Sequence, residues 1–89
     1  MDFEWDDAKQ QRTREERGFD FSFASQIFGG VVLERADKRR NYGEHRIVAI
    51  GKVRDTFVTL VYTDRGDARR IIAAWPSSRR ERKLWLSAE

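Results

Sequence analysis

The sequence predicts an α+β fold in which a small antiparallel β-sheet carries two N-terminal helices and one C-terminal helix. The chain has 89 residues, enough for one hydrophobic core but not for two, so we expect residues 1–89 to form a single domain. The apolar pattern changes near residue 31 from helical spacing to alternation, which is typical of strands. A Ser-Arg-Arg-Glu motif near the C-terminus is typical of a helix start.

The first expected elements are a short strand and a polar helix. Phe3–Trp5 alternates apolar and polar residues, as a short edge strand does. Either Asp6 or Asp7 is suited to cap a helix over Ala8–Arg17, and Gly18 is suited to end it. This helix has almost no apolar stripe, so we expect it on the surface.

A core helix and four strands are expected next. Asp20 is suited to cap a helix over Phe21–Phe28, which Gly29–Gly30 would end. A charged loop is expected over Arg35–Asn41. Four segments are predicted to be strands, and the last three are joined by turn residues that include Gly66: Val31–Leu33, Arg46–Lys52, Thr56–Thr63 and Ala68–Ala74.

The chain ends with a predicted helix, and the sheet before it has an unusual pattern. Pro76 would stop the last strand, and a capping box at Ser78–Glu81 predicts a helix from about Arg79 to the C-terminus. The two middle strands are apolar on both faces, so both faces of the sheet need cover. We infer that a partner protein binds one face. The alternative is that the polar N-terminal helix folds back over it.

The charge of the chain is unevenly distributed. Eighteen Lys and Arg residues against fifteen Asp and Glu residues give a formal net charge of +3. Residues 1–30 carry four bases and seven acids, or −3, whereas residues 31–89 carry fourteen bases and eight acids, or +6. A basic body rich in arginine favours a polyanionic partner. On charge alone, a well-solvated surface is the favoured interpretation.

The composition excludes several classes of site. The chain has no cysteine and one histidine, His45, so a two-histidine acid–base pair and a histidine or thiolate metal site are not expected. We expect no metal and no other cofactor. No apolar run is long enough to cross a membrane, and the acidic N-terminus does not resemble a signal peptide. A cytoplasmic protein without a membrane partner is the expectation.

The remaining chemistry belongs to arginine, lysine, tyrosine and glutamate. Three basic clusters contain it: Lys38–Arg46, Arg69–Arg70 and Arg79–Lys83. RNA suits these groups because its 2′-hydroxyl lies next to its own phosphodiester. Arginines can stabilise the pentacoordinate phosphorane, and a tyrosine, glutamate or lysine can transfer protons. The alternative for each cluster is a solvated basic surface.

Motifs along nearly the whole chain are similar to one known family. The matching stretches, in chain order, are Phe3–Asp6 with Ala8–Lys9, Gly18-x-x-Phe21, Arg39-Arg40-x-Tyr42-Gly43-Glu44-x-Arg46, Ile50–Gly51, Val61–Gly66, Arg70–Ile72 and Arg79–Arg82. Together they resemble the BrnT family, small bacterial toxins of type II toxin–antitoxin modules. The Trp-Asp start, the Tyr-Gly-Glu-x-Arg box and the Arg-Arg-Glu box carry the resemblance jointly.

The resemblance implies a fold, an activity and a partner. It implies a RelE-like fold and a ribonuclease that blocks translation. It also implies a DNA-binding antitoxin similar to BrnA, a ribbon-helix-helix protein that neutralises the toxin. With that antitoxin the toxin would repress their operon, so operator DNA would be contacted only through the antitoxin.

The chain departs from the family pattern around the expected groove. Glu16-Arg17-Gly18 replaces Lys-His-Gly, Thr13 replaces Asn, and Ala73-Ala74-Trp75-Pro76 replaces Ser-Ala-Arg-Lys. Arg17 cannot act as a general base near neutral pH. Trp75 is suited to stack on a base, or to pack in the ordinary way, which is the favoured interpretation. A weakened or inactive toxin therefore stays open.

Nine residues are candidates for the RNA site. We interpret Arg46 and Arg70 as clamps for the phosphate and the transition state, and Arg79 as a further charge stabiliser. The candidate proton carriers are Glu81 and Tyr42, although Glu81 also fits a purely structural capping role. The other candidates are Lys9, which would reach the groove from the first helix or simply be solvated, and the RNA backbone contacts Arg39, Arg40 and Arg80.

Two rival hypotheses remain. A toxin relic that only binds its antitoxin is favoured by the missing family residues and disfavoured by the intact boxes. A direct DNA-binding domain is the least favoured hypothesis, because the sequence has no helix-turn-helix spacing and its net charge is small.

Overall fold

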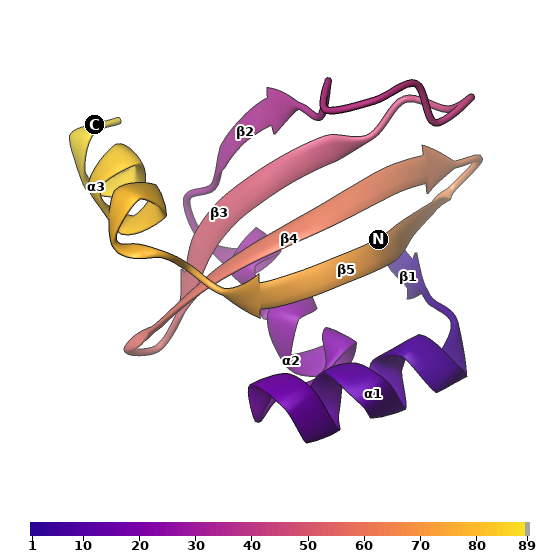
Figure 1. Ribbon diagram of the computed structural model, residues 1–89, viewed down its shortest axis with the longest axis horizontal. Coiled ribbons are helices and arrows are strands. Elements are labelled where there is room, and N and C mark those ends of the chain that lie inside the picture. The colour runs from indigo at the N-terminus through magenta and orange to yellow at the C-terminus, as the bar shows by residue number, and fades with distance from the viewer. Residues whose placement is uncertain (89) are drawn as a thin grey trace.

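A five-stranded sheet forms the centre of the molecule, as the computed structural model of residues 1–88 shows (Figure 1). Its strand order is β1-β5-β4-β3-β2. The strands are β1 (Asp2–Glu4), β2 (Leu33–Ala36), β3 (Ile47–Val53), β4 (Thr56–Arg65) and β5 (Ala68–Pro76). The helices are α1 (Asp7–Arg17), α2 (Phe21–Ala24), the 3₁₀ helix η1 (Ser25–Gly29) and α3 (Arg79–Ser87). The predicted α+β class is confirmed.

The sheet is mixed, so the expectation of a purely antiparallel sheet is wrong. β1 pairs parallel to β5, with Asp2 opposite Ala68 and Glu4 opposite Arg70, while every other pair of strands is antiparallel. The N-terminal strand is an edge strand, as predicted, at Asp2–Glu4 rather than Phe3–Trp5. A parallel pairing needs a long connection, which here is supplied by most of the chain.

The first helix has the caps that its sequence predicts. The Asp6 side chain accepts a hydrogen bond from the Lys9 backbone N–H at 3.0 Å, so Asp6 rather than Asp7 is the N-cap. Gly18 adopts a left-handed conformation with φ of 81°, which a residue with a side chain rarely accepts. No residue of α1 is buried, in agreement with its polar sequence.

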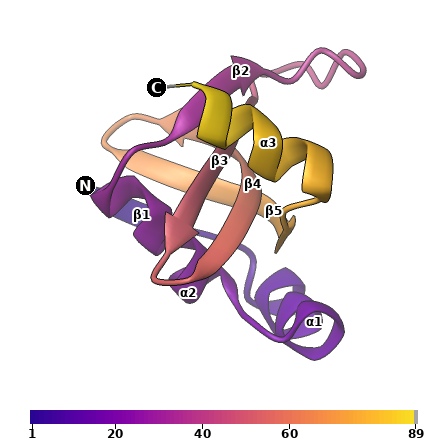
Figure 2. The same ribbon diagram turned by 90° about the vertical axis from the view of Figure 1, so that its left-hand side faces the viewer.

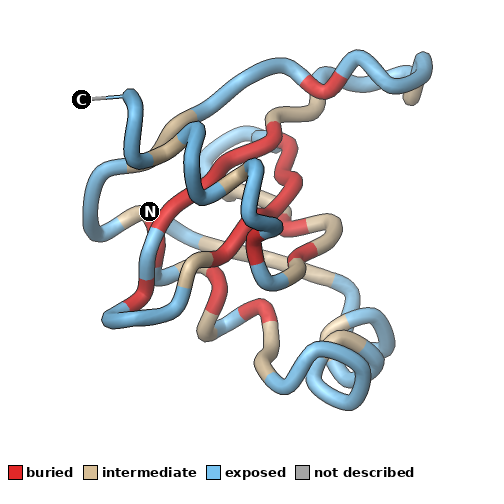
Figure 3. Tube along the Cα trace, turned by 60° about the vertical axis from the view of Figure 1, so that its left-hand side comes forward, coloured by how far each residue is buried: buried red, intermediate tan, exposed pale blue. Residues whose placement is uncertain are grey.

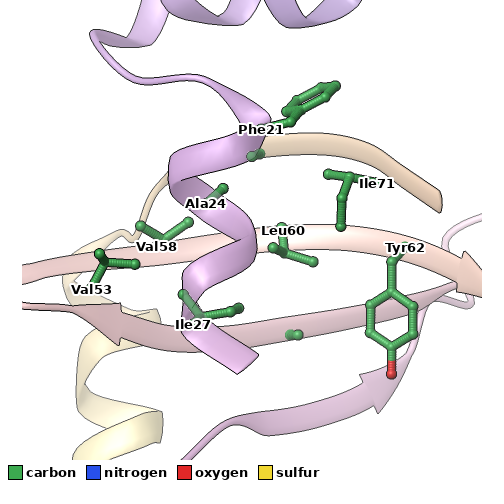
Figure 4. Packing of buried hydrophobic residues seen from close by; sticks show 10 residues of the cluster. Phe21, Ala24, Ile27, Val53, Val58, Leu60, Tyr62 and Ile71 are labelled. Atoms are coloured by element: carbon green, nitrogen blue, oxygen red, sulfur yellow. The ribbon is translucent and has the colours of Figure 1, made fainter. Parts of the chain in front are cut away.

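The helix expected over Phe21–Phe28 is shorter and changes type. Asp20 caps it as predicted, but α2 ends at Ala24 and continues as the 3₁₀ helix η1. Its buried residues, Phe21, Ala24 and Ile27, are spaced by three, and a 3₁₀ helix has three residues per turn. The tighter winding therefore keeps Ile27 on the sheet, where all three residues face Leu60 and its neighbours (Figure 4).

β2 begins later than its sequence suggests. A strand was expected at Val31–Leu33 and a loop from Arg35, but β2 covers Leu33–Ala36. Leu33 pairs with Ile50 of β3, and the Tyr62 hydroxyl donates a hydrogen bond to the Glu34 carboxylate. Charged residues are tolerated here because β2 is an edge strand whose side chains reach solvent.

The meander β3–β4–β5 agrees with the sequence analysis. The β3–β4 turn places Arg54 at φ of 55°, and the β4–β5 turn places Gly66 at φ of 57°. Pro76 is the last residue of β5. A register shift between Val61 and Tyr62 shows a bulge in the β4–β5 pair, which turns the side chains of β5 relative to those of β4.

Helices lie on both sides of the sheet (Figure 2). The core face, which carries Ala49, Leu60 and Ile71, packs against α2 and η1. The opposite side, named the groove face, carries Val48 and Val61, and α3 covers one end of it. There the Trp85 ring of α3 meets the Phe57 ring of β4 edge to face at 5.5 Å between centroids.

The central strands are the most buried part of the chain (Figure 3). Val61 is 1% exposed although it lies on the groove face. The helix that covers this face is α3, not the N-terminal helix that the sequence offered as the alternative to a partner. Within residues 1–88 no helix is long and apolar enough to cross a membrane.

Candidate functional site

A cavity of about 430 Å³ opens on the groove face between β2, β5 and the start of α3. We call it the Trp75 groove. Basic side chains of β2 and of the loop after it line one wall, and Trp75 and Glu81 line the other. The full lining is Arg35, Ala36, Asp37, Lys38, Arg39, Val48, Trp75 and Glu81. Its size lies within the range of small-ligand sites.

Asp37 fixes the loop that forms the basic wall. Its side chain is 1% exposed and accepts hydrogen bonds from Nε and Nη2 of Arg39, both at 2.8 Å. The hydrogen bonds from Arg39 lower the pKa of the Asp37 carboxyl from 3.8 to about 2. Arg39 keeps 63% of its side chain exposed, so its outer edge stays open to a ligand.

Glu81 and Trp75 form the opposite wall as one unit. The Trp75 indole Nε1 donates to both carboxylate oxygens of Glu81, at 3.2 and 3.3 Å. The same carboxylate accepts the Ser78 backbone N–H at 2.7 Å, which completes the predicted capping box. Glu81 therefore has the structural role that the sequence analysis offered as its alternative, and it also lines the groove.

Tyr42 and Arg46 lie against each other in the segment before β3. The Arg46 guanidinium lies over the Tyr42 ring at 4.0 Å from its centroid, and Arg40 approaches the same ring at 5.3 Å. Glu44 accepts a hydrogen bond from Arg46 Nε at 2.9 Å. Arg46 stands two residues before Val48, so strand alternation puts it on the groove side of the sheet.

Arg70 lies on the same face, on β5, which is the strand next to the edge strand β1. It is paired with Thr63 in the β4–β5 ladder and forms an ion pair with Glu4 of β1 at 3.6 Å. Arg79 and Arg80 are exposed on the first turn of α3. Neither of them lines the Trp75 groove.

A second cavity of about 230 Å³ lies between α1 and β5, and we call it the α1 cleft. Lys9 lines it together with Arg12 and Arg17, so the structure puts Lys9 beside the sheet. The cleft exists because β1 pairs only with residues 68–70 of β5 and leaves residues 71–76 for α1 to flank. Trp75 lines both cavities.

Four of the cationic residues at these cavities are not among the nine candidates from the sequence: Arg12, Arg17, Arg35 and Lys38. The sequence predicts Arg35 in a charged loop, whereas Arg35 pairs opposite Val48 in the sheet. The signal available in the sequence was the spacing of Leu33 and Arg35, which are two residues apart, as are side chains on one face of a strand. Arg12 was read as a surface residue of a polar helix, and only the packing of α1 on β5 brings it to the cleft.

Arg69, the neighbour of Arg70, has a structural environment. It lies on the core face between the rings of Phe28 and Tyr62, at 4.8 and 4.0 Å from their centroids, and is held by the Asp64 carboxylate at 2.8 Å. Burial, with the hydrogen bond to Glu34, raises the pKa of the Tyr62 hydroxyl above its usual value. This cluster closes one end of the core.

Carboxylates around the cavities do not gather into a cation site. Among residues 1–88 no group of three or more His, Cys, Asp or Glu side chains is arranged to hold a metal ion. The acidic groups of the Trp75 groove, Asp37 and Glu81, are each engaged by hydrogen bonds from the chain itself.

Comparison with known proteins identifies the family to which the chain belongs. No curated protein sequence matches the chain with significant similarity. A family model described as the ribonuclease toxin BrnT of type II toxin–antitoxin systems matches residues 5–81. The match includes every strand after β1 and both cavities described above. The chain therefore belongs to the BrnT family of ribonuclease toxins.

Proposed function

We propose that the chain is an endoribonuclease toxin that cleaves RNA without a metal ion and thereby inhibits translation. The observation that carries the proposal is the Trp75 groove, where cationic side chains face a carboxylate across a cavity of about 430 Å³. Membership of a ribonuclease toxin family supports the reaction class. RNA and ribosomes are cytoplasmic, so the proposed substrate makes a cytoplasmic location the natural one.

The proposed reaction uses the RNA's own nucleophile. A base removes the proton of the 2′-hydroxyl, and the 2′-oxygen forms a bond to the adjacent phosphorus. The bond from phosphorus to the 5′-oxygen breaks, and an acid protonates that oxygen as it leaves. The products are a 2′,3′-cyclic phosphate and a 5′-hydroxyl. Guanidinium groups lower the barrier by stabilising the extra negative charge on the phosphorane.

We assign the roles from the contacts of each side chain. Arg46 and Arg70, which lie on the groove face but do not line the Trp75 groove, would hold the scissile phosphate, and Arg79 would add charge from α3. Tyr42, whose ring centroid lies 4.0 Å from Cζ of Arg46, is the candidate proton carrier from the loop. Glu81 is the candidate carrier from the opposite wall, although its oxygens already accept hydrogen bonds from Ser78 and Trp75.

The remaining candidates would bind the RNA backbone. Arg39 lines the groove, Arg40 lies over Tyr42, and Arg80 is exposed on α3. Lys9 would bind the phosphates of the RNA backbone in the α1 cleft. Such contacts are salt-dependent, because each phosphate neutralised releases counterions.

A protein antitoxin is implied by the type II toxin–antitoxin family. We propose a DNA-binding, ribbon-helix-helix antitoxin similar to BrnA, which would neutralise the toxin and repress the operon together with it. Apolar side chains exposed on the segment before β2 and on α3 favour a protein partner: Val31 is 74% exposed and Leu86 is 58% exposed. The expected partner-binding face of the sheet stays a prediction.

Expression of the chain alone in a bacterium tests the activity. We expect growth arrest with loss of RNA, and we expect Arg46→Ala to relieve both. Arg54→Asn is the matched control, since it removes one exposed arginine at the β3–β4 turn, and asparagine tolerates the positive φ there. Normal growth at good expression of the unaltered chain would favour the rival, a relic that only binds its antitoxin.

The chemistry is tested on purified protein and a short RNA. We expect cleavage in the presence of a chelator and a product with a 2′,3′-cyclic phosphate end. A single 2′-deoxy nucleotide at the cleavage position should abolish the reaction, because it removes the nucleophile. Cleavage of that substrate at an unchanged rate would overturn the mechanism.

A further inference from the structure

We propose that Trp75 is the stacking platform for one unpaired base of single-stranded RNA, and that the RNA backbone crosses β5 from the Trp75 groove to the α1 cleft. This inference rests on the proposed function and adds to it a strand path and the residue that orients a base. It starts from the position of Trp75, which is half-buried and lines both cavities.

The two cavities are cationic on both sides of this ring. Arg35, Lys38 and Arg39 line the groove, and Lys9, Arg12 and Arg17 line the cleft. Against these six cations stand three acids, Asp37, Glu81 and Glu16. Asp37 is neutralised by Arg39, and all six cations belong to exposed residues. An aromatic ring between two basic cavities is the arrangement with which proteins bind single strands.

The ring is held in one orientation. Its Nε1 is fixed by both oxygens of Glu81, and Glu81 is in turn fixed by the backbone of Ser78 at the start of α3. The N–H edge is thereby satisfied by α3. An oriented ring loses little conformational freedom on binding, so it is well suited to receive a base.

The neighbouring residues leave room for the strand to cross. β5 carries Ala73 next to the ring, and this small residue lines the α1 cleft. Within residues 1–88, the edge of β5 beyond residue 70 pairs with no strand, and α1 lies along it. A duplex cannot present a base to this ring without unstacking it, so the site selects single strands.

The binding of a 2′-O-methyl single-stranded RNA, which cannot be cleaved through its 2′-oxygen, tests the platform. We expect Trp75→Leu to weaken binding by about fivefold to a hundredfold, because leucine keeps an apolar side chain but cannot stack. Trp75→Phe keeps an aromatic ring but loses the hydrogen bonds to Glu81, so it should weaken binding less than Trp75→Leu does. Both are measured by fluorescence anisotropy of a labelled RNA.

Trp85→Phe is the matched control, since Trp85 packs on Phe57 and donates to the Val31 carbonyl away from the groove. RNA should quench the indole fluorescence of the unaltered chain and of Trp85→Phe, but should quench Trp75→Phe much less. Thermal unfolding checks that Trp75→Leu is folded. If it is not, the quenching difference between the two Phe variants decides the question.

The outcomes separate this inference from the proposed function. If the unaltered chain binds and cleaves RNA while Trp75→Leu binds it equally well, the stacking platform is wrong and the ribonuclease stands. If the unaltered chain binds no single-stranded RNA, both are wrong. Equal affinity of the unaltered chain for duplex and single-stranded RNA would also overturn the platform.

Discussion

The two faces of the sheet belong to the same strands but differ in what covers them. The core face buries Leu60 and Ile71 under Phe21 and Ile27 in one hydrophobic cluster. The groove face buries Val48 and Val61 but surrounds them with charged residues of β2, the following loop and α3. The same apolar alternation therefore supports a dry core on one side and a basic cavity on the other.

The difference teaches what an apolar strand pattern does and does not require. Val48, Ile50 and Val61 are buried on the groove face, where α3 covers one end. Leu60 and Ile71 lie instead in the main hydrophobic cluster, under α2 and η1. The core face should hence carry most of the stability, and the groove face should tolerate changes that alter binding.

The largest expected effect is on the core face. Leu60→Ala removes a side chain that is 0% exposed and leaves a cavity under α2, which should lower the free energy of unfolding by about 2–5 kcal/mol. Arg35→Ala in the Trp75 groove should change it by less than about 0.5 kcal/mol. Urea denaturation measures the free energy of unfolding of both variants. Equal losses would contradict the larger contribution of the core face to stability.

The next effect comes from the close approach of η1 to β3. A Cβ at Gly51 would lie 2.7 Å from Cβ of Ile27, so Gly51→Ala must push η1 away from the sheet. We expect a loss of roughly 1–3 kcal/mol in stability. Ile27→Val keeps the Cβ atom that the new methyl group at position 51 would meet, so adding this change to Gly51→Ala should not restore the stability. Full recovery of stability in the double variant would show that the contact is looser than described.

On the groove face, the start of α3 is the most sensitive point for stability. Ser78→Ala removes the hydroxyl that accepts the Glu81 N–H at 3.1 Å, and it should cost about 1 kcal/mol. Ser87→Ala, at the other end of α3, is the control and should have almost no effect. A thermal shift of equal size in the two variants would mean that the cap does not stabilise the helix.

The smallest effect is the acid response of the groove wall. The pKa of Asp37 lies at about 2, below its ordinary value of 3.8, because Arg39 donates hydrogen bonds to it. The stability it contributes is complete above about pH 4 and is lost as the pH falls towards 2. Because Arg39 is largely exposed, we expect less than about 1 kcal/mol.

Asp37→Asn isolates this contribution from those of the other carboxyl groups. The stability difference between the unaltered chain and the variant should shrink between pH 5 and pH 2 in urea denaturation. A difference that stays constant over this range would show that the Asp37–Arg39 pair does not contribute through its charge.

Local signals in the sequence predicted the elements whose ends are set by single residues. Asp6, Asp20 and Ser78 cap helices through their own side chains, and Gly18 and Gly66 occupy turns that need a positive φ. Each of these depends on contacts within a few residues, so the sequence is enough to find them.

Contacts between distant segments set the features that the sequence analysis missed. The parallel pairing of β1 depends on residues 68–70, and the 3₁₀ winding of η1 depends on the fit of Ile27 against Gly51. The same holds for the site. Basic clusters were visible, but the meeting of Trp75 with α1 on one side and β2 on the other required the packed sheet.

The pairing of β1 has a consequence for synthesis of the protein. Asp2 meets Ala68, so 66 positions of chain separate the partners, and closing so long a loop is slow compared with local contacts. A nascent polypeptide has no partner for its first strand until β5 has left the ribosome. Because α1 directly follows β1, we expect the α1 cleft to assemble only after β5 has been synthesised.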